Sequence, residues 1–229
     1  MANLWFDDEL LPVLQHSVRK LVAAAEAPRR RKTARTSASS RPAASTGAML
    51  CADESRCKVL TVGHSTRPIE VFIELLASHG VTQLIDVRTV PRSRHNPQFN
   101  QDVLPVSLVA ANIGYAHARG LGGFRLTTAD SVNMGWRNLS FRGYADCMQT
   151  TDFAADLASV MALAHTDRVA LMCAEAVPWR CHRSLVADAL LVRGVAVCEI
   201  VNAKRLQAHK LTPFAQVRGE EITYPIAMP

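Results

Sequence analysis

The sequence predicts an α/β fold with three layers, in which helices cover both faces of a mostly parallel sheet. Two β-α-β units, over residues 58–87 and 168–201, support this prediction, because short apolar strands alternate in them with helical patterns. Before the second unit, apolar residues recur at helical spacing over 151–165 and predict a further helix. The stretch 88–150 lacks any such period, so we expect a long irregular insertion rich in arginine and aromatic residues.

The boundaries within each unit follow from residue type. In the first unit Pro68 is suited to the first turn of a helix and Gly80 ends that helix; the flanking strands are 58–63 and 81–87. In the second unit Gly194 ends the helix. The segments of the second unit are a strand at 168–173, a helix near 182–193 and a strand at 195–201.

The chain outside the α/β domain, which we place at residues 58–205, divides into three parts. Leucines and valines at helical spacing predict an amphipathic helix within residues 1–26. Residues 27–57 are rich in Arg, Ser, Ala and Thr and have little to bury, which predicts a disordered basic linker. Residues 206–229 are expected to form a C-terminal tail.

The basic charge of the chain is concentrated near its start. The formal net charge is +6, but residues 1–50 hold eight Lys/Arg against four Asp/Glu, so only +2 remains for the rest. A domain so close to neutrality has no broad basic footprint for nucleic acid. The basic tail could attract nucleic acid weakly, although a solvated linker is the simpler interpretation.

Composition predicts a cytoplasmic protein that does not enter a membrane. No apolar run approaches the roughly 20 residues that a membrane-spanning helix needs. The acidic run 7–9 interrupts the first apolar stretch and leaves no secretory signal, so we expect reduced thiols in a cytoplasm. Among the six cysteines, Cys147 and Cys198 lie in apolar patterns and are expected in the core, whereas Cys51 and Cys57 carry no usable signal.

Polar residues follow three predicted strands at their carboxyl ends, where open α/β sheets bind ligands. These segments are 63–65 (GHS), 86–88 (DVR) and 173–175 (CAE). His64 and Ser65 would either contact a ligand or cap the following helix. Asp86 and Arg88 could pair with each other, but we favour an arginine elsewhere in the cleft as the partner of Asp86, since buried Asp is uncommon unless paired.

The loop after Cys173 resembles an anion-binding loop only in part. Cys173 and Arg180 form a C-x6-R pattern, one residue longer than the C-x5-R loop with which cysteine phosphatases hold phosphate. Glu175 would place negative charge in such a loop, and Pro178 removes one of its N–H donors. These features argue against a thiol phosphatase.

Two further interpretations concern the start of the following helix. A metal ion could use Cys173, Cys181 and His182, but their spacing matches none of the common zinc patterns. Alternatively, residues 181–183 (CHR) open a helix whose free N–H groups favour an anion, with Arg180 or Arg183 adding a bidentate contact. A cysteine at such a position would have a lowered pKa and could act as a nucleophile.

The leading hypothesis is a polar, arginine-rich cleft that binds a small anionic or nucleotide-like ligand, and a hydrolase or a transferase would fit it. Cys173 or Cys181 is the candidate nucleophile, and Glu175 or His182 is the candidate acid or base. The expected ligand contacts are His64, Ser65, Asp86, Arg88, Arg92 and Arg183. Two alternatives stay open. One is a nucleic-acid-binding module that uses the arginine/aromatic insertion and the basic tail. The other is a structural metal site at Cys173, Cys181 and His182.

The order of these motifs resembles that of a known family, the domain of unknown function 488, over residues 58–205. The motifs that carry the resemblance are 63–65 (GHS), 86–88 (DVR), 91–93 (PRS), 96–99 (NPQF), 121–123 (LGG), 173–175 (CAE) and 181–183 (CHR). The resemblance implies an α/β domain in which the three strand-end motifs are signature positions. It implies no particular reaction, cofactor or oligomeric state.

Overall fold

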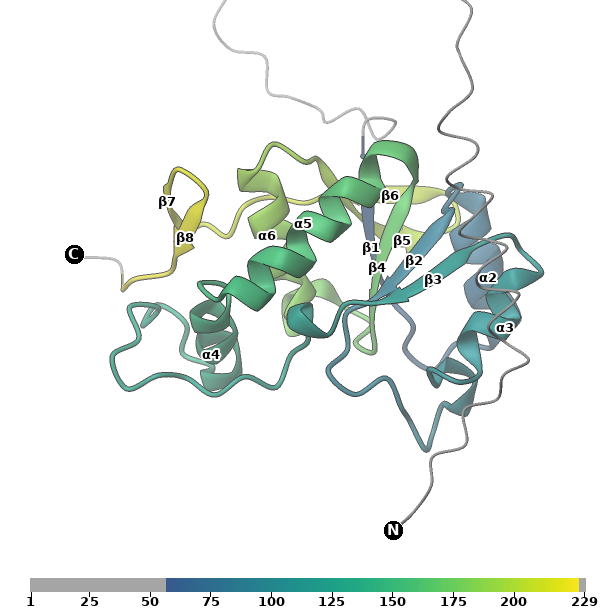
Figure 1. Cartoon of the computed structure of the whole chain (residues 1–229), viewed down its shortest axis with the longest axis horizontal. Helices are drawn as coiled ribbons and strands as arrows, with labels where there is room; N and C mark the ends of the chain where they lie inside the picture. The colour runs from purple at the N-terminus through teal and green to yellow at the C-terminus, as the bar shows by residue number, and fades with distance from the viewer. Residues whose placement is uncertain (1–56, 227–229) are drawn as a thin grey trace, which may run out of the picture. The chain divides into compact units, whose positions relative to one another are not determined.

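A six-stranded sheet lies at the centre of the computed structural model, which describes residues 57–226 (Figure 1). Its strands follow the order β3-β2-β4-β1-β5-β6, and every neighbouring pair is parallel except β5 and β6. The strands are β1 (Val59–Gly63), β2 (Gln83–Asp86), β3 (Gly114–His117), β4 (Val169–Cys173), β5 (Val197–Asn202) and β6 (Arg205–Ala208). The prediction of a mixed α/β fold with a mostly parallel sheet is confirmed.

Both predicted β-α-β units are present and they interleave. The first is β1, α2 (Ile69–Ser78) and β2, and the second is β4, α6 (Arg183–Val192) and β5. Because β4 lies between β1 and β2, while β1 lies between β4 and β5, the two units share the centre of the sheet. The helix predicted over 151–165 is α5 (Thr151–Thr166). Gly80 and Gly194 follow α2 and α6 with φ values of 66° and 77°, as expected of glycines that end helices.

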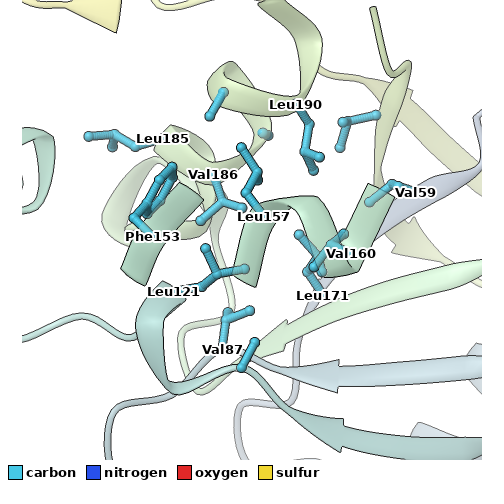
Figure 2. Packing of buried hydrophobic residues seen from close by; sticks show 14 of the residues in the cluster. Val59, Val87, Leu121, Phe153, Leu157, Val160, Leu171, Leu185, Val186 and Leu190 are labelled. Atoms are coloured by element: carbon cyan, nitrogen blue, oxygen red, sulfur yellow. The ribbon is translucent and has the colours of Figure 1, made fainter. Parts of the chain in front are cut away.

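Alternate residues of the central strands belong to two separate hydrophobic clusters. Val59 and Leu171 pack in one cluster, with residues of α5 and α6. Their chain neighbours Leu60 and Met172 pack in the other, with residues of α2 and α3 (Leu104–Val109). Since successive side chains of a strand point to opposite faces, the clusters lie on opposite faces of the sheet. Figure 2 shows the first cluster, in which Leu157 of α5 approaches Val186 of α6.

The stretch 88–150 is more ordered than the sequence suggested. It contains α3, β3, α4 (Leu139–Cys147) and the 3-10 turns Pro97–Phe99 and Arg119–Leu121. Strand β3 extends the sheet by pairing with β2. Its four residues, GYAH, are all half-buried, so they carry no apolar run or alternation by which a strand could be recognised.

The segment that we expected to be a tail, 206–229, is packed on the domain as far as Tyr224. It completes β6 and forms a hairpin of β7 (Gln216–Arg218) and β8 (Glu221–Thr223). Tyr224 is fully buried and its hydroxyl donates to buried Asp188 of α6 at 2.9 Å. Asp188 also accepts from the His209 ring and the Thr212 backbone N–H. The helix expected within 1–26, and all of the linker 27–57 except Cys57, lie outside the described residues.

The cysteines depart from the expectation of reduced thiols. Cys57 and Cys198 form a disulfide that ties the chain before β1 to β5. Cys198 is buried as predicted, and so is Cys147. Three thiols are free within residues 57–226, at Cys147, Cys173 and Cys181. Across the same residues, no helix is long and apolar enough to cross a membrane.

Candidate functional site

A cavity of about 650 Å³ lies where β1, β2 and β4 end. The parallel register places Gly63 beside Cys173 and Asp86 beside Met172, so the three strands run into the same region. Eight of the ten predicted site residues line the cavity: His64, Ser65, Arg88, Arg92, Cys173, Glu175, Cys181 and His182. The other two, Asp86 and Arg183, do not line it but contact residues that do.

The loop after β4 is packed directly against the end of β1. The backbone N–H groups of His64 and Ser65 donate to the carbonyls of Cys173 and Ala174, at 2.9 and 3.0 Å. A methyl group on Gly63 would overlap the carbonyl oxygen of Glu175. Glycine is therefore required at residue 63 by close backbone approach, and this approach fixes the loop that carries the candidate nucleophile.

Cys173 has the environment of a thiolate. Its Sγ accepts from Nη1 of Arg183 at 2.7 Å and from the Cys181 thiol at 2.7 Å. Although burial favours the neutral thiol, the Cys181 hydrogen bond and the Arg183 charge outweigh it and lower the pKa of Cys173. The same hydrogen bond, together with burial, raises the pKa of Cys181, so Cys181 keeps the proton.

Arg183, which was predicted to contact a ligand, does not line the cavity. It is fully buried, and Nη1 donates to the Glu175 carbonyl as well as to the sulfur. Its Nη2 donates to the Ala176 carbonyl at 3.1 Å and to Glu199 at 2.8 Å. All four acceptors lie in the protein, so Arg183 holds the loop and the thiolate from the interior.

The favoured partner of Asp86, an arginine elsewhere in the cleft, was wrong, because Asp86 pairs with Arg88. Nε of Arg88 donates to Asp86 at 2.8 Å, and Nη2 donates to the other carboxylate oxygen and to the Phe99 carbonyl. Residues two apart in an extended segment point to the same side, which makes this pairing geometrically easy. The Tyr115 hydroxyl also donates to Asp86. Arg88 thus reaches the cavity with its charge largely balanced.

His64 is neutral and held in place. Its ring stacks on Phe99 with centroids 4.1 Å apart, and Nδ1 donates to the Ser65 carbonyl at 2.7 Å. This leaves Nε2 to accept from Nη1 of Arg88 at 3.3 Å. Burial and the nearby Arg88 charge lower the pKa of His64 to about 4, partly opposed by the Ser65 hydrogen bond. His64 therefore contacts the cavity through a neutral ring.

His182 is also neutral, and its geometry opposes the metal alternative. Nε2 donates to the Val87 carbonyl at 2.9 Å, which leaves Nδ1 as an acceptor 3.6 Å from the Cys181 sulfur. Burial lowers its pKa to about 4. Within residues 57–226 no three His, Cys, Asp or Glu side chains are arranged to hold a metal ion. The buried cation of Arg183 against the Cys173 sulfur would repel one.

The outer part of the cavity combines free charges with aromatic rings. The side chains of Arg92, Glu175 and Arg180 are exposed, and none makes a hydrogen bond or ion pair with the rest of residues 57–226. Phe124 and Phe141 add apolar surface to the lining. The chain thus presents two unpaired cations and one carboxylate beside aromatic surface.

Glu199 is a residue of the candidate site that the sequence interpretation missed. It lies in β5 and accepts from Arg183, and the Thr61 hydroxyl, opposite it in the β1–β5 register, also donates to it. An acidic residue within the apolar strand VAVCEIV was the available signal, since such a position requires a buried partner. Arg180 was considered only as an alternative to Arg183, and it is Arg180 that lines the cavity.

Two arginines of the insertion make structural hydrogen bonds to backbone carbonyls. Arg125 donates to the carbonyls of Arg119, Gly120 and Gly122, and Arg142 donates to the Trp136 carbonyl. The Trp136 ring packs on neighbouring aromatic rings of the core. Because these arginines are bonded within the protein, the insertion gives less support to the nucleic-acid hypothesis. The basic tail that the hypothesis also uses lies outside the described residues.

The fold and the cavity define a mixed α/β protein with a buried cysteine of lowered pKa at the carboxyl ends of its parallel strands. The chain belongs to the family described as domain of unknown function DUF488, whose model matches residues 68–190, more than half of its length. The match is narrower than the predicted 58–205 and begins after the 63–65 motif. No curated protein and no solved structure matches the chain, so the family brings no reaction with it.

Proposed function

We propose that the cavity binds a small anionic or nucleotide-like ligand and that Cys173 is the nucleophile of an enzyme, a hydrolase or transferase, that acts on it. The observation that carries the proposal is the position of Cys173. It lines the cavity at the end of β4, while Arg183 contacts its sulfur at 2.7 Å from the interior. A thiolate so stabilised is the reactive form of cysteine in covalent catalysis.

The charges of the cavity favour an anionic ligand. Arg88 is balanced by Asp86, which leaves Arg92 and Arg180 as free cations against the single carboxylate of Glu175. Guanidinium groups bind phosphate and carboxylate in bidentate geometry. A volume of about 650 Å³ is in the range of sites for small molecules, and the rings of the lining would accommodate an apolar or aromatic portion.

Proton transfer in this proposal falls to Glu175 or His182. Glu175 is exposed at the cavity, and its side chain makes no hydrogen bond within residues 57–226. His182 is neutral above its lowered pKa of about 4, and its free Nδ1 faces Cys181 rather than the open cavity. Glu175 is therefore the better placed of the two to act on a bound ligand.

Binding can be tested with defined anions. Calorimetry and thermal shift with inorganic phosphate and adenosine monophosphate should detect saturable binding that weakens with salt. Arg92→Ala and Arg180→Ala should each weaken it about tenfold, which corresponds to ~1.4 kcal/mol. Arg94→Ala is the matched control, because Arg94 is exposed nearby but does not line the cavity. Equal affinities in all three variants, or no binding of either anion, would overturn the ligand assignment.

The nucleophile can be tested separately. Iodoacetamide should alkylate Cys173 faster than Cys181 or Cys147 at pH 7.5, as read by peptide mass spectrometry, because the pKa of Cys173 is lowered. A bound anion should slow this alkylation. Preferential labelling of Cys147 would contradict the assignment of Cys173 as the nucleophile.

A further inference from the structure

Cys181 is the second thiol of the cavity, and the proposed function, in which Cys173 is the nucleophile, assigns it no role. It immediately precedes the first turn of α6, whereas Cys173 ends β4, yet their sulfurs are 2.7 Å apart. Both are buried and both line the cavity. No other pair of free thiols within residues 57–226 can meet, because Cys147 is the only remaining one and its sulfur contacts Thr150.

The two thiols are chemically unequal, as the partners in thiol–disulfide exchange must be. The Cys173 sulfur accepts from Arg183 and from the Cys181 thiol, which lowers the pKa of Cys173 and favours its thiolate, whereas Cys181 holds its proton. In such exchange a thiolate attacks a disulfide sulfur, and a second thiol nearby resolves the mixed disulfide that results. The Cys173–Cys181 contact provides both groups at one cavity wall.

We propose that Cys173 and Cys181 form a dithiol–disulfide couple that reduces low-molecular-weight disulfides carrying carboxylates. The dithiol–disulfide couple itself rests on the contact between the Cys173 and Cys181 sulfurs. The preference for an acidic disulfide rests on the proposed function, that is, on Arg92 and Arg180 as free cations of the cavity.

The reaction has two steps. In the first, the Cys173 thiolate attacks one sulfur of the disulfide; the bond from Cys173 to that sulfur forms, the substrate S–S bond breaks and one thiolate leaves. In the second, the Cys181 sulfur attacks Cys173; the Cys173–Cys181 bond forms and the second substrate sulfur leaves with the proton of Cys181. The dithiol loses two electrons, the disulfide gains them, and an external thiol such as dithiothreitol restores the dithiol.

The surroundings of Cys181 explain how it becomes reactive only after the first step. Its hydrogen bond to the Cys173 thiolate is the largest reason that it holds its proton. Once Cys173 is bonded to substrate, that thiolate is gone. The Arg183 charge then remains beside Cys181, and Nδ1 of His182 lies 3.6 Å from its sulfur with a lone pair to accept the proton.

The experiment uses the full chain and oxidised glutathione, with peptide mass spectrometry after acid quenching. Wild-type protein should lose two hydrogen atoms in mass, with Cys173 and Cys181 in one disulfide-linked peptide pair. Cys181→Ser should instead hold glutathione on Cys173, and that adduct should persist about tenfold longer than any in the wild type. Cys147→Ser is the control and should behave as wild type. Circular dichroism confirms that each variant folds.

Three results would overturn the couple: no Cys173–Cys181 link in the wild type, an adduct of equal lifetime in wild type and Cys181→Ser, or glutathione bound only at Cys147. The charge preference is tested with cystamine, a cationic disulfide, which should react about tenfold more slowly than oxidised glutathione. Arg92→Ala/Arg180→Ala should abolish that difference. If the Cys173–Cys181 link forms equally fast with both disulfides, the proposal of a dithiol–disulfide couple is supported and the proposal of an anionic ligand is refuted. If phosphate binds but no Cys173–Cys181 link forms, the proposal of the couple is refuted and the proposal of an anionic ligand is supported.

Discussion

Arg183 is the residue whose removal should disturb the protein most, and Arg183→Met removes its charge at similar volume. The substitution removes hydrogen bonds to the Cys173 sulfur, to two loop carbonyls and to Glu199. It leaves the Glu199 carboxylate, whose side chain is only 13% exposed, without its cation. Breaking a buried ion pair by removing one partner costs about 3–5 kcal/mol. We expect a loss of that size in the free energy of unfolding.

The assay is urea unfolding at pH 7.5, followed by circular dichroism. Arg180→Met is the matched control, because Arg180 is exposed and should change stability by at most ~0.5 kcal/mol. Arg183→Met/Glu199→Met should recover at least ~1 kcal/mol of the loss, since replacing both members removes the uncompensated charge. A single variant that loses less than ~1 kcal/mol, or a double variant less stable than the single one, would refute this reasoning.

Three further predictions concern pH, backbone packing and the disulfide. Since the pKa of His64 falls from 6.5 in the unfolded chain to about 4 in the protein, its contribution to stability is complete above pH 6.5 and is lost as pH falls towards 4. Urea unfolding should show His64→Gln losing about 3 kcal/mol less than wild type over that range, and parallel curves would contradict it. Gly63→Ala should destabilise by about 3 kcal/mol, because its methyl group overlaps the Glu175 carbonyl, and normal thermal stability would show that the loop is not packed there. Cys57→Ser should lose about 2–5 kcal/mol by removing a crosslink between residues 141 apart, and wild-type stability under reducing conditions should match it; an unchanged melting temperature would count against the disulfide.

The parts of the fold that the sequence predicted are those with a strong local period. Strands β1 and β4 are fully buried apolar runs, and α2 begins after a proline and ends before a glycine. Strand β3 was missed because its order comes from pairing with β2 rather than from its own residues. The hairpin of β7 and β8 was missed for a related reason: its three-residue strands are exposed apart from Ile222 and half-buried Thr223.

The convergence of the three strand-end motifs could be predicted because the carboxyl ends of parallel strands share one edge of the sheet, and β2, β4 and β1 are neighbours. The individual partners were harder to predict, since they depend on the path of the loop between β4 and α6. A 3-10 turn at Pro178–Arg180 lies within this loop. Arg183, the first residue of α6, faces inward to the Cys173 sulfur, while Arg180 stays exposed. Spacing alone does not distinguish these two orientations.

Arg183, Arg180 and Arg92 look equivalent in the sequence, but their different positions in the structure give them different expected roles in the site. Both terminal nitrogens of Arg183 donate to the Cys173 sulfur, two carbonyls and Glu199, and its remaining Nε–H is buried without a partner among residues 57–226. We therefore expect Arg183 to act on the Cys173 thiol rather than on a substrate anion. In the proposed function, Arg92 and Arg180 recognise the charge of the substrate, since both line the cavity and have no partners in the described chain. Loss of Arg183 should therefore change thiol reactivity and stability, whereas loss of Arg180 should change affinity alone.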